Sequence, residues 1–303
     1  MKPKLVIAAA NGFLGNALIQ KFKQNYEVVC LVRKPRTSTD EVRYVLWDGK
    51  NVGDWKHELA NATALINLAG RSINCRYTEE NKQAILHSRL ESTRVLGEAI
   101  QQLQHKPKIW MNCSSVTLYE HSFDTAQDEF STTFSEGFST DVCKQWEAAF
   151  TSFTFPAVRQ LILRIAVVLG KNEGALKPLV PLTKLGLGGK SGSGLQQFSW
   201  IHIDDFCNAI SFLIEKSTSV GAFNMCSPQP VTNGYFMRAL RQVLRIPFGL
   251  PQPAWVVKLG AMLIGTEAEL VLESRYVVPT RLTKEGFTFS YPEIKAALQQ
   301  LLL

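Results

Sequence analysis

The sequence lacks long apolar runs and paired cysteines. No stretch among its 303 residues approaches the roughly 18 uninterrupted apolar residues that a transmembrane helix needs, so no membrane-spanning helix is predicted. The six cysteines are widely scattered and form no C-x-x-C pair, which indicates neither a zinc site nor a disulfide framework. Free thiols are typical of a reducing compartment, and we expect a cytoplasmic protein. With 46% hydrophobic and 19% charged residues, the chain is not disordered.

Dense basic runs are also missing, although the net charge is +7. Nucleic-acid binders usually alternate such runs with aromatic residues, so we do not expect a nucleic-acid partner. Most of the excess lies in the segment 159–190, where spaced basic residues oppose Glu173 alone. This spacing predicts a pocket for a small anionic substrate, contacted by Arg164 and Lys190. The basic residues of the segment are Arg159, Arg164, Lys171, Lys177, Lys184 and Lys190.

The beginning of the chain is typical of a nucleotide-binding turn. The apolar run 4–9 predicts a buried strand, and AANGFLG is followed by an amphipathic segment, which favours a folded unit over a signal peptide. Gly12 would let the backbone approach a pyrophosphate, and Gly15 would let the helix pack against the strand. Ala9 replaces the usual first glycine, which is tolerated if the turn keeps a negative φ. A purely structural glycine turn is the alternative. The residues predicted to contact the cofactor are Ala9, Asn11, Gly12, Phe13, Leu14 and Gly15.

The end of the second expected strand, 27–32, bears on the choice of cofactor. An acidic residue there would bind the ribose 2′-hydroxyl of NAD, but the chain has Arg33 and Lys34. Two cations suit the 2′-phosphate of NADP, because guanidinium and ammonium groups bind phosphate well. We therefore expect NADP to be preferred over NAD. A solvated pair of surface charges is the alternative.

Strands and helices continue to alternate up to residue 170. Strands are predicted at 63–70, 109–113 and 160–168, and helices at 78–104 and about 139–153. This order predicts an α/β fold with a doubly wound parallel sheet of the Rossmann type and a smaller, mostly helical C-terminal substrate lobe. The sheet domain would comprise 1–170 and about 200–226, and the lobe 171–199 and 227–303, ending in a short domain at about 250–303. Further cofactor contacts are expected from Leu68, Ala69, Gly70, Arg89 and Val168.

The residues resemble the NAD(P)-dependent epimerase/dehydratase group of the extended short-chain dehydrogenases/reductases. The turn AANGFLG and the phrase INLAG are similar to that group's motifs. A narrower likeness covers about residues 4–302 and includes WDGK (47–50), HSRLEST (87–93) and LGLGGKSGSGLQQFSWIHIDD (185–205). It points to an atypical subfamily described as epimerase-family proteins or NADP-dependent oxidoreductases, with a short C-terminal domain of unknown function. The resemblance implies a Rossmann fold, a bound NADP and a substrate-binding serine at Ser115.

One departure from the superfamily affects the mechanism. Its reductases use Tyr-x-x-x-Lys on a helix, where the lysine lowers the tyrosine pKa and the tyrosine relays a proton. Counted back from Glu147, the corresponding positions hold Ser139 and Cys143, and neither can do this work. Lys144 is one residue away, which on a helix points it about 100° aside. The usual proton relay is therefore not predicted.

The remaining candidates for chemistry each have a plainer interpretation. Ser115 and Tyr119 are the weak catalytic candidates, and the alternatives are a hydroxyl bonded to backbone and a packed tyrosine. A structural role is favoured for His202, with Asp204 or its neighbour capping a helix. Cys143 is expected to be a buried, inert thiol, and no metal site is predicted. The glycine-rich stretch 186–194 predicts a flexible flap.

Three functions follow from these features. The first is an NADP-binding oxidoreductase or epimerase-like enzyme that acts on a small, anionic substrate. The second is a non-enzymatic NADP-binding sensor or scaffold, which the missing Tyr/Lys pair favours. The third is a nucleotide-sugar epimerase, for which the sequence contains no sugar-specific residue. The oligomeric state is not indicated.

Overall fold

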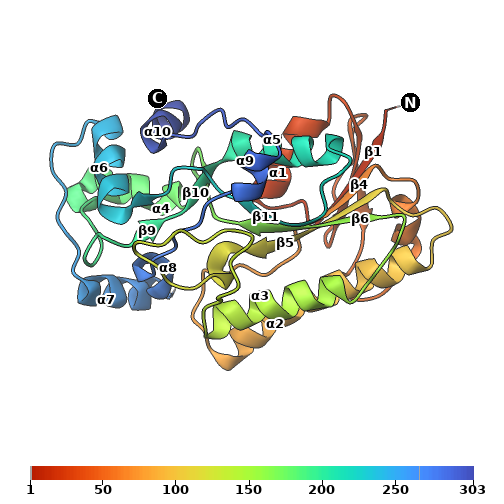
Figure 1. The fold of residues 1–303 in the computed structure, drawn as a ribbon, viewed down its shortest axis with the longest axis horizontal. Coiled ribbons are helices and arrows are strands. Elements are labelled where there is room, and N and C mark those ends of the chain that lie inside the picture. Colours follow the sequence, from red (N-terminus) through yellow and green to blue (C-terminus); the bar gives the residue numbers. More distant parts are fainter. Residues whose placement is uncertain (1, 266) are drawn as a thin grey trace.

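The computed structural model describes residues 2–265 and 267–303. It shows a layered lobe built on a sheet and a smaller lobe at one end of that sheet (Figure 1). None of the helices in the described part of the chain is both long and apolar enough to cross a membrane.

The sheet has seven parallel strands in the order β11-β6-β5-β4-β1-β2-β3. The chain builds outward from β1 to β3 and then returns to β4 on the other side of β1, so the strand order reverses between β1 and β4. Ligands of doubly wound sheets bind at the carboxyl ends of the strands at such a reversal. The strands are β1 (Lys4–Ala8), β2 (Glu27–Val32), β3 (Val42–Leu46), β4 (Ala64–Asn67), β5 (Ile109–Ser115), β6 (Arg159–Ile165) and β11 (Gly221–Met225).

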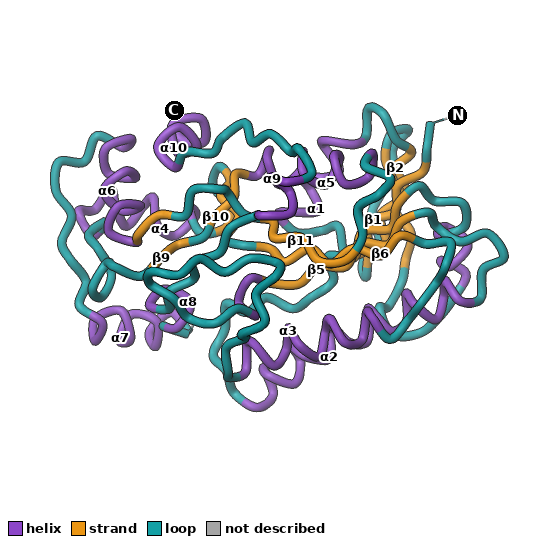
Figure 2. The backbone as a smooth tube through the Cα atoms, viewed as in Figure 1, coloured by secondary structure: helices purple, strands orange, loops and turns teal. Residues whose placement is uncertain are grey.

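Helices cover both faces of the sheet, as Figure 2 shows. One face packs against α2 and α3, and the other against α1 and α5. Both cores combine buried apolar residues of the strands with buried apolar residues of the covering helices, which confirms the predicted α/β doubly wound fold. The helices of this lobe are α1 (Phe13–Phe22), η1 (Asp54–Leu59), α2 (Glu79–Gln101), η2 (Val116–Leu118), α3 (Phe138–Thr151), α5 (Ile203–Glu215) and α9 (Thr280–Lys284).

The smaller lobe is mostly helical and has its own core, formed around α6 and α10. Leu176, Trp200, Phe236 and Leu298 are fully or almost fully buried there. Its elements are β7 (Val167–Gly170), β8 (Glu173–Gly174), α4 (Leu176–Leu182), η3 (Thr183–Leu187), β9 (Gln197–Phe198), β10 (Trp200–His202), β12 (Val231–Thr232), α6 (Asn233–Leu244), α7 (Ala254–Ile264), α8 (Glu269–Leu272) and α10 (Ile294–Leu302).

Side-chain hydrogen bonds cap the N-termini of α6 and α5. Thr232 caps α6 by accepting a hydrogen bond from the Tyr235 N–H at 3.2 Å. The cap of α5 is His202, whose Nδ1 accepts from the Asp204 N–H at 3.0 Å. The expectation of an aspartate cap was therefore wrong, because the imidazole occupies the capping position.

Candidate functional site at the carboxyl edge of the sheet

The glycine turn connects β1 to α1 at the point where the strand order reverses. Ala9 adopts φ = 59°, the left-handed region that favours glycine. The condition of a negative φ, under which alanine would be readily tolerated at this position, is therefore not met. Ala9 is held there by its N–H, which donates to Leu31 O at 2.9 Å.

The two glycines of the turn have different surroundings. A Cβ on Gly12 would meet nothing within 4 Å, so the backbone at the start of α1 faces open space. A Cβ on Gly15 would lie 2.4 Å from Ala10 O, which leaves no room for a side chain. The Phe13 ring fills the space beside Gly170, where a Cβ would lie 2.4 Å from it. The N-terminus of α1 is therefore accessible to an anion, and Phe13 links this turn to the β7–β8 hairpin.

Arg33 and Lys34 directly follow β2 and are exposed. Arg33 borders a hollow of about 720 Å³ whose other walls include Trp47 and Asp48. The Asp48 carboxylate accepts the Lys50 and Asn51 N–H groups at 2.8 Å, which lowers its pKa to about 2. Two cations and an ionised carboxylate therefore lie at the ends of β2 and β3.

The loop after β4 is positioned by Arg89, a residue of α2. Its Nη1 donates to Arg71 O and to Ile85 O, each at 3.0 Å. Its guanidinium carbon lies 3.1 Å from the place of a Cβ on Gly70 and 5.1 Å from the centre of the Trp146 ring. Burial lowers the pKa of Arg89. Arg89 therefore fixes the backbone of the loop that holds Leu68, Ala69 and Gly70, while Val168 lies in β7 beside β10.

A buried polar network connects β5, α3 and β6. The Arg164 Nε and Nη2 donate to the two oxygens of Glu147 at 2.9 and 2.8 Å, and Ser114 Oγ donates to Glu147 Oε1 at 2.6 Å. Arg164 Nη1 donates to the Tyr119 hydroxyl at 2.8 Å, and this hydroxyl donates to Asn224 Oδ1 at 2.8 Å. Arg164 is thus neutralised within the protein, which contradicts its expected role as a substrate-binding cation.

Tyr119 is fully buried in the same network. Burial raises the pKa of Tyr119 to about 12, and both hydrogen-bonding directions of its hydroxyl are used. The hydroxyl cannot donate to a substrate without breaking the network. Its placement agrees with the packed tyrosine that was the alternative to a catalytic role.

The other basic residues of the segment 159–190 do not form an anion pocket. Arg159 donates four hydrogen bonds to backbone carbonyls at the C-terminal end of α5 and just beyond it, including Leu213 O and Lys216 O. Lys190 is exposed and lies outside the cavity described below. Arg159 and Arg164 are therefore not free to form the predicted basic pocket, because a charge count does not reveal which groups already bind each cation.

The glycine-rich stretch 186–194 is fastened to the small lobe. Gln252 N donates to Lys190 O and Gly192 N donates to Gln252 O, both at 2.8 Å. A Cβ on Gly189 would lie 2.1 Å from Leu250 O, so glycine here allows two backbone segments to touch. In this structure the stretch is therefore packed against, and hydrogen-bonded to, the segment 250–252 of the small lobe. Its composition had suggested a flexible flap.

A cavity of about 630 Å³ lies between the two lobes, next to the carboxyl ends of β5 and β6. Ser115 lines it, and the Ser115 Oγ is 2.7 Å from Thr117 Oγ1. The walls come from eight separate segments of the chain. They include Ser72–Asn74, Ser115–Thr117, Ile165–Val167, Pro178, Leu179, Gln196–Ser199, Asn233, Phe236, Met237, Glu269, Val271, Glu273 and Arg275.

The two positions predicted to correspond to the superfamily's Tyr/Lys pair differ in their access to this cavity. Ser139 lines it, and its Oγ donates to Glu269 Oε1 at 3.1 Å and lies 3.2 Å from the Tyr77 hydroxyl. Cys143 is buried, which raises the pKa of its thiol to about 11. Sequence reasoning missed Tyr77 and Glu269, because they come from distant segments and no motif contains them.

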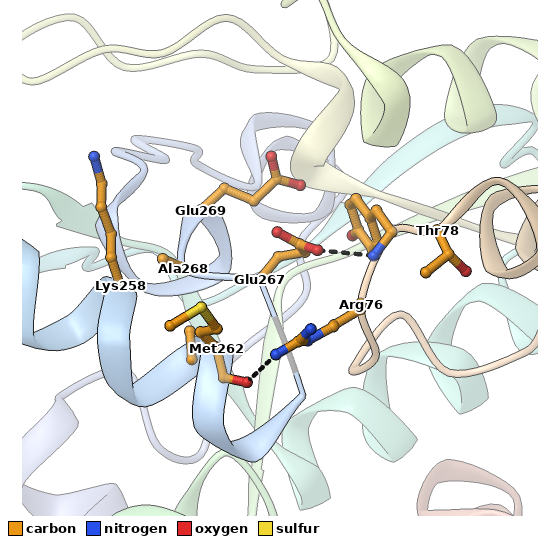
Figure 3. Close-up of a pocket in the computed structure, with 9 residues that line it drawn as sticks. Arg76, Thr78, Lys258, Met262, Glu267, Ala268 and Glu269 are labelled. Atoms are coloured by element: carbon orange, nitrogen blue, oxygen red, sulfur yellow. Dashed lines mark hydrogen bonds between the residues drawn. The ribbon is translucent and has the colours of Figure 1, made fainter.

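A smaller hollow of about 530 Å³ marks where the loop after β4 meets the small lobe (Figure 3). Arg76 Nη2 donates to Met262 O at 2.6 Å, and the Tyr77 N–H donates to Glu267 Oε1 at 2.7 Å. These contacts join the two lobes over one side of the cavity. No spacing in the sequence predicts them, because the partners are nearly 190 residues apart.

His202 and Asp205 have structural partners. His202 Nε2 lies 2.9 Å from Gln300 Oε1, and burial lowers the pKa of this imidazole. The Asp205 carboxylate accepts the Ser290 and Tyr291 N–H groups at 2.7 and 2.9 Å. Over residues 2–265 and 267–303, no three His, Cys, Asp or Glu residues group as metal ligands.

Two families match this chain. Residues 5–226 match the NAD dependent epimerase/dehydratase family, and residues 252–301 match a domain of unknown function, DUF1731. An epimerase family protein of Staphylococcus haemolyticus is 32% identical over 301 residues, covering 99% of each chain. One of Staphylococcus saprophyticus is 33% identical over 303 residues, covering 98% of each chain.

Solved structures share the architecture. The human epimerase family protein SDR39U1, crystallised with NADPH, superposes with a TM-score of 0.88 at 31% identity, covering 98% of each chain. A UDP-N-acetylglucosamine 4-epimerase from Bacillus cereus superposes with a TM-score of 0.77 at 14% identity, covering 99% of this chain and 95% of the other. At that identity the second likeness is one of fold alone.

Proposed function

Because this chain belongs to the NAD-dependent epimerase/dehydratase family, we propose that it is an NADP(H)-dependent oxidoreductase or epimerase-like enzyme acting on a small molecule. The observation that carries the proposal is the turn 9–15. Open space over Gly12 adjoins the N-terminus of α1, where backbone N–H groups and the helix dipole favour a phosphate. The human relative with NADPH supports the same cofactor.

The preference for NADP rests on Arg33 and Lys34. Both are exposed at the carboxyl end of β2, where the ribose of a nucleotide bound at the turn would lie. Two cations there would bind a 2′-phosphate. MoeE5, which shares only the fold, was crystallised with NAD, so the fold by itself does not decide between the cofactors.

The residues we propose around the cofactor are those of the turn, the loop 68–70 that Arg89 supports, and Val168. When bound, the nicotinamide supplies a hydride acceptor or donor at C4. The protein must orient the substrate and handle a proton. Ser115 lines the cavity at the sheet edge, and we assign it the binding of the substrate's reacting oxygen. Domain boundaries near 170 and 226 and a cytoplasmic location remain parts of this proposal.

A second function, an NADP(H)-binding sensor or scaffold without turnover, is favoured by one observation. Ser139 and Cys143 stand where reductases of the superfamily have tyrosine and lysine, and the Cys143 thiol is buried and resists ionisation. Such a protein would bind the cofactor but catalyse nothing.

Fluorescence titration with NADPH and with NADH tests the proposal, followed by NADPH consumption with a panel of carbonyl compounds. We expect NADPH to bind at least about tenfold more tightly, since each lost hydrogen bond to a phosphate costs about 1.5–3 kcal/mol. NADPH binding with no turnover of any compound would favour the sensor. Equal affinity for NADH would overturn the cofactor preference, and no binding of either would overturn the whole proposal.

A further inference from the structure

The cavity between the lobes contains little charge to attract an anion. We infer that its substrate is a neutral carbonyl compound, or the corresponding alcohol, with a largely apolar body, and is neither a carboxylate nor a nucleoside diphosphate sugar. The inference rests on the proposed function, because it names the substrate class of that site. It replaces the anionic substrate that the basic segment 159–190 suggested.

The charged side chains along the cavity are Glu269, Glu273 and Arg275. Arg275 is paired with Glu273, and its Nη1 donates to Tyr119 O at 3.0 Å. Within the described residues, no lysine and no second arginine line the cavity. An anionic group would therefore meet two carboxylates and one cation that is already neutralised, whereas a diphosphate needs several free donors or cations.

The cavity wall formed by α4, β9 and α6 presents mainly apolar side chains to a ligand. Several polar atoms of its side chains are occupied by the protein: Gln196 Nε2 donates to Ser191 O at 2.9 Å, and Asn233 Oδ1 accepts the Ser191 N–H at 2.9 Å. Ser199 Oγ donates to Arg275 O at 2.7 Å. What remains for a ligand is apolar surface on α4, β9 and α6, from Pro178, Leu179, Phe198, Phe236 and Met237.

Hydroxyl groups lie at the opposite end, beside the carboxyl end of β5. The Ser115 and Thr117 hydroxyl oxygens are 2.7 Å apart and share a hydrogen bond, and the Ser139 hydroxyl donates to Glu269 Oε1. Each hydroxyl can still accept or donate one more hydrogen bond. A single polar atom of the substrate fits here, next to the proposed nicotinamide position, while the apolar body extends toward α4 and α6. Pockets of such a volume commonly enclose a small molecule with one or two oriented polar groups.

Calorimetry on protein saturated with NADP⁺, which cannot reduce an aldehyde, tests the inference with matched ligands. These are decanal, the ten-carbon oxo acid that adds a carboxylate at the far end, and UDP-glucose. We expect decanal to bind at least about tenfold more tightly than the oxo acid, and UDP-glucose not to bind, because the added charge loses solvation without gaining a partner. Equal or tighter binding of the oxo acid, binding of UDP-glucose, or no binding of decanal would overturn it.

Substitutions at two leucines of α4 distinguish an effect inside the cavity from an effect at the protein surface. Leu179 lines the apolar wall, whereas Leu182 is 40% exposed and lies outside the cavity lining. We expect Leu179→Lys to weaken decanal binding about tenfold and to strengthen oxo acid binding relative to Leu179→Glu, since only the lysine attracts a carboxylate. Leu182→Lys should change neither. Decanal binding unaffected by both Leu179 variants would overturn the inference.

The NADPH titration keeps this inference separate from the proposed function. Each Leu179 variant should bind NADPH as the unaltered protein does, because Leu179 lies outside the turn 9–15. Loss of NADPH binding in the unaltered protein would overturn the proposed function itself. Retained NADPH binding with the wrong ligand preference would overturn the substrate class alone.

Discussion

The nucleotide turn and the cavity are assembled in different ways. The turn takes its shape from seven consecutive residues, 9–15, and depends on small side chains and backbone geometry. The cavity draws its walls from segments between Ser72 and Arg275 and depends on which side chains they place inside. Local sequence therefore specifies the turn, whereas only the folded chain specifies the cavity. Substitutions that affect one site and spare the other test this difference.

The largest effect should come from Glu147→Gln, in the buried network that connects β5, α3 and β6 and belongs to neither site. The substitution leaves the buried Arg164 charge without a counter-ion, and losing one partner of a buried pair costs about 3–5 kcal/mol. We expect a fall of about 3 kcal/mol in the free energy of unfolding, measured with urea. Glu98→Gln, which removes the partially exposed pair with Arg94, is the control and should cost less than about 0.5 kcal/mol. Similar losses in the two variants would contradict this.

The next effect should come from Gly15→Ala, compared with Gly12→Ala. A methyl on Gly15 overlaps backbone atoms of Ala10, which cannot move aside, so we expect a loss of about 2 kcal/mol of stability. A methyl on Gly12 meets open space and should leave stability unchanged, but it should weaken NADPH binding about tenfold by blocking a phosphate. Thermal unfolding and NADPH titration measure the two effects. Full NADPH affinity in Gly12→Ala would argue against a pyrophosphate at the turn.

The double substitution Arg33→Ala with Lys34→Ala should reduce the affinity for NADPH and leave that for NADH unchanged. The loss of charge-assisted hydrogen bonds to a phosphate is worth about 2 kcal/mol, or about 30-fold in the dissociation constant. Lys171→Ala with Lys177→Ala removes the same charge from exposed positions elsewhere and is the matched control. If the control weakens NADPH binding equally, net charge and not local recognition is responsible.

The smallest effect should be the gain in stability from Ala9→Gly. A left-handed alanine costs about 1 kcal/mol, and the added backbone entropy of glycine offsets most of the gain, so about 0.5 kcal/mol should remain. The urea midpoint should rise slightly. Ala10→Gly, at a neighbouring residue outside the left-handed region, should lower it. A lower midpoint for Ala9→Gly would mean that the methyl packs favourably.

The sequence predicted the sheet well because buried parallel strands are continuous apolar runs. It did not place β3, an edge strand in which only Val42 is buried, so its residues form no continuous buried run. Arg164, in β6, was misinterpreted because its partner, Glu147, lies on α3, and no sequence spacing reveals that the two side chains meet. Arg159 was misinterpreted because its partners are backbone carbonyls, which composition does not reveal. Ser115 was found because it ends a strand, whereas Tyr77 and Glu269 lie outside any motif.

The partners of His202 and Asp205 have a consequence for the order of folding during synthesis. Both residues begin α5, which covers one face of the sheet, yet their buried polar groups are satisfied by Ser290, Tyr291 and Gln300. Until the ribosome has released residues 290–300, α5 would have to dock with the Asp205 carboxylate and the His202 Nε2 lacking these partners. The start of α5 therefore gains its full set of buried hydrogen bonds only once the last residues of the chain have been made.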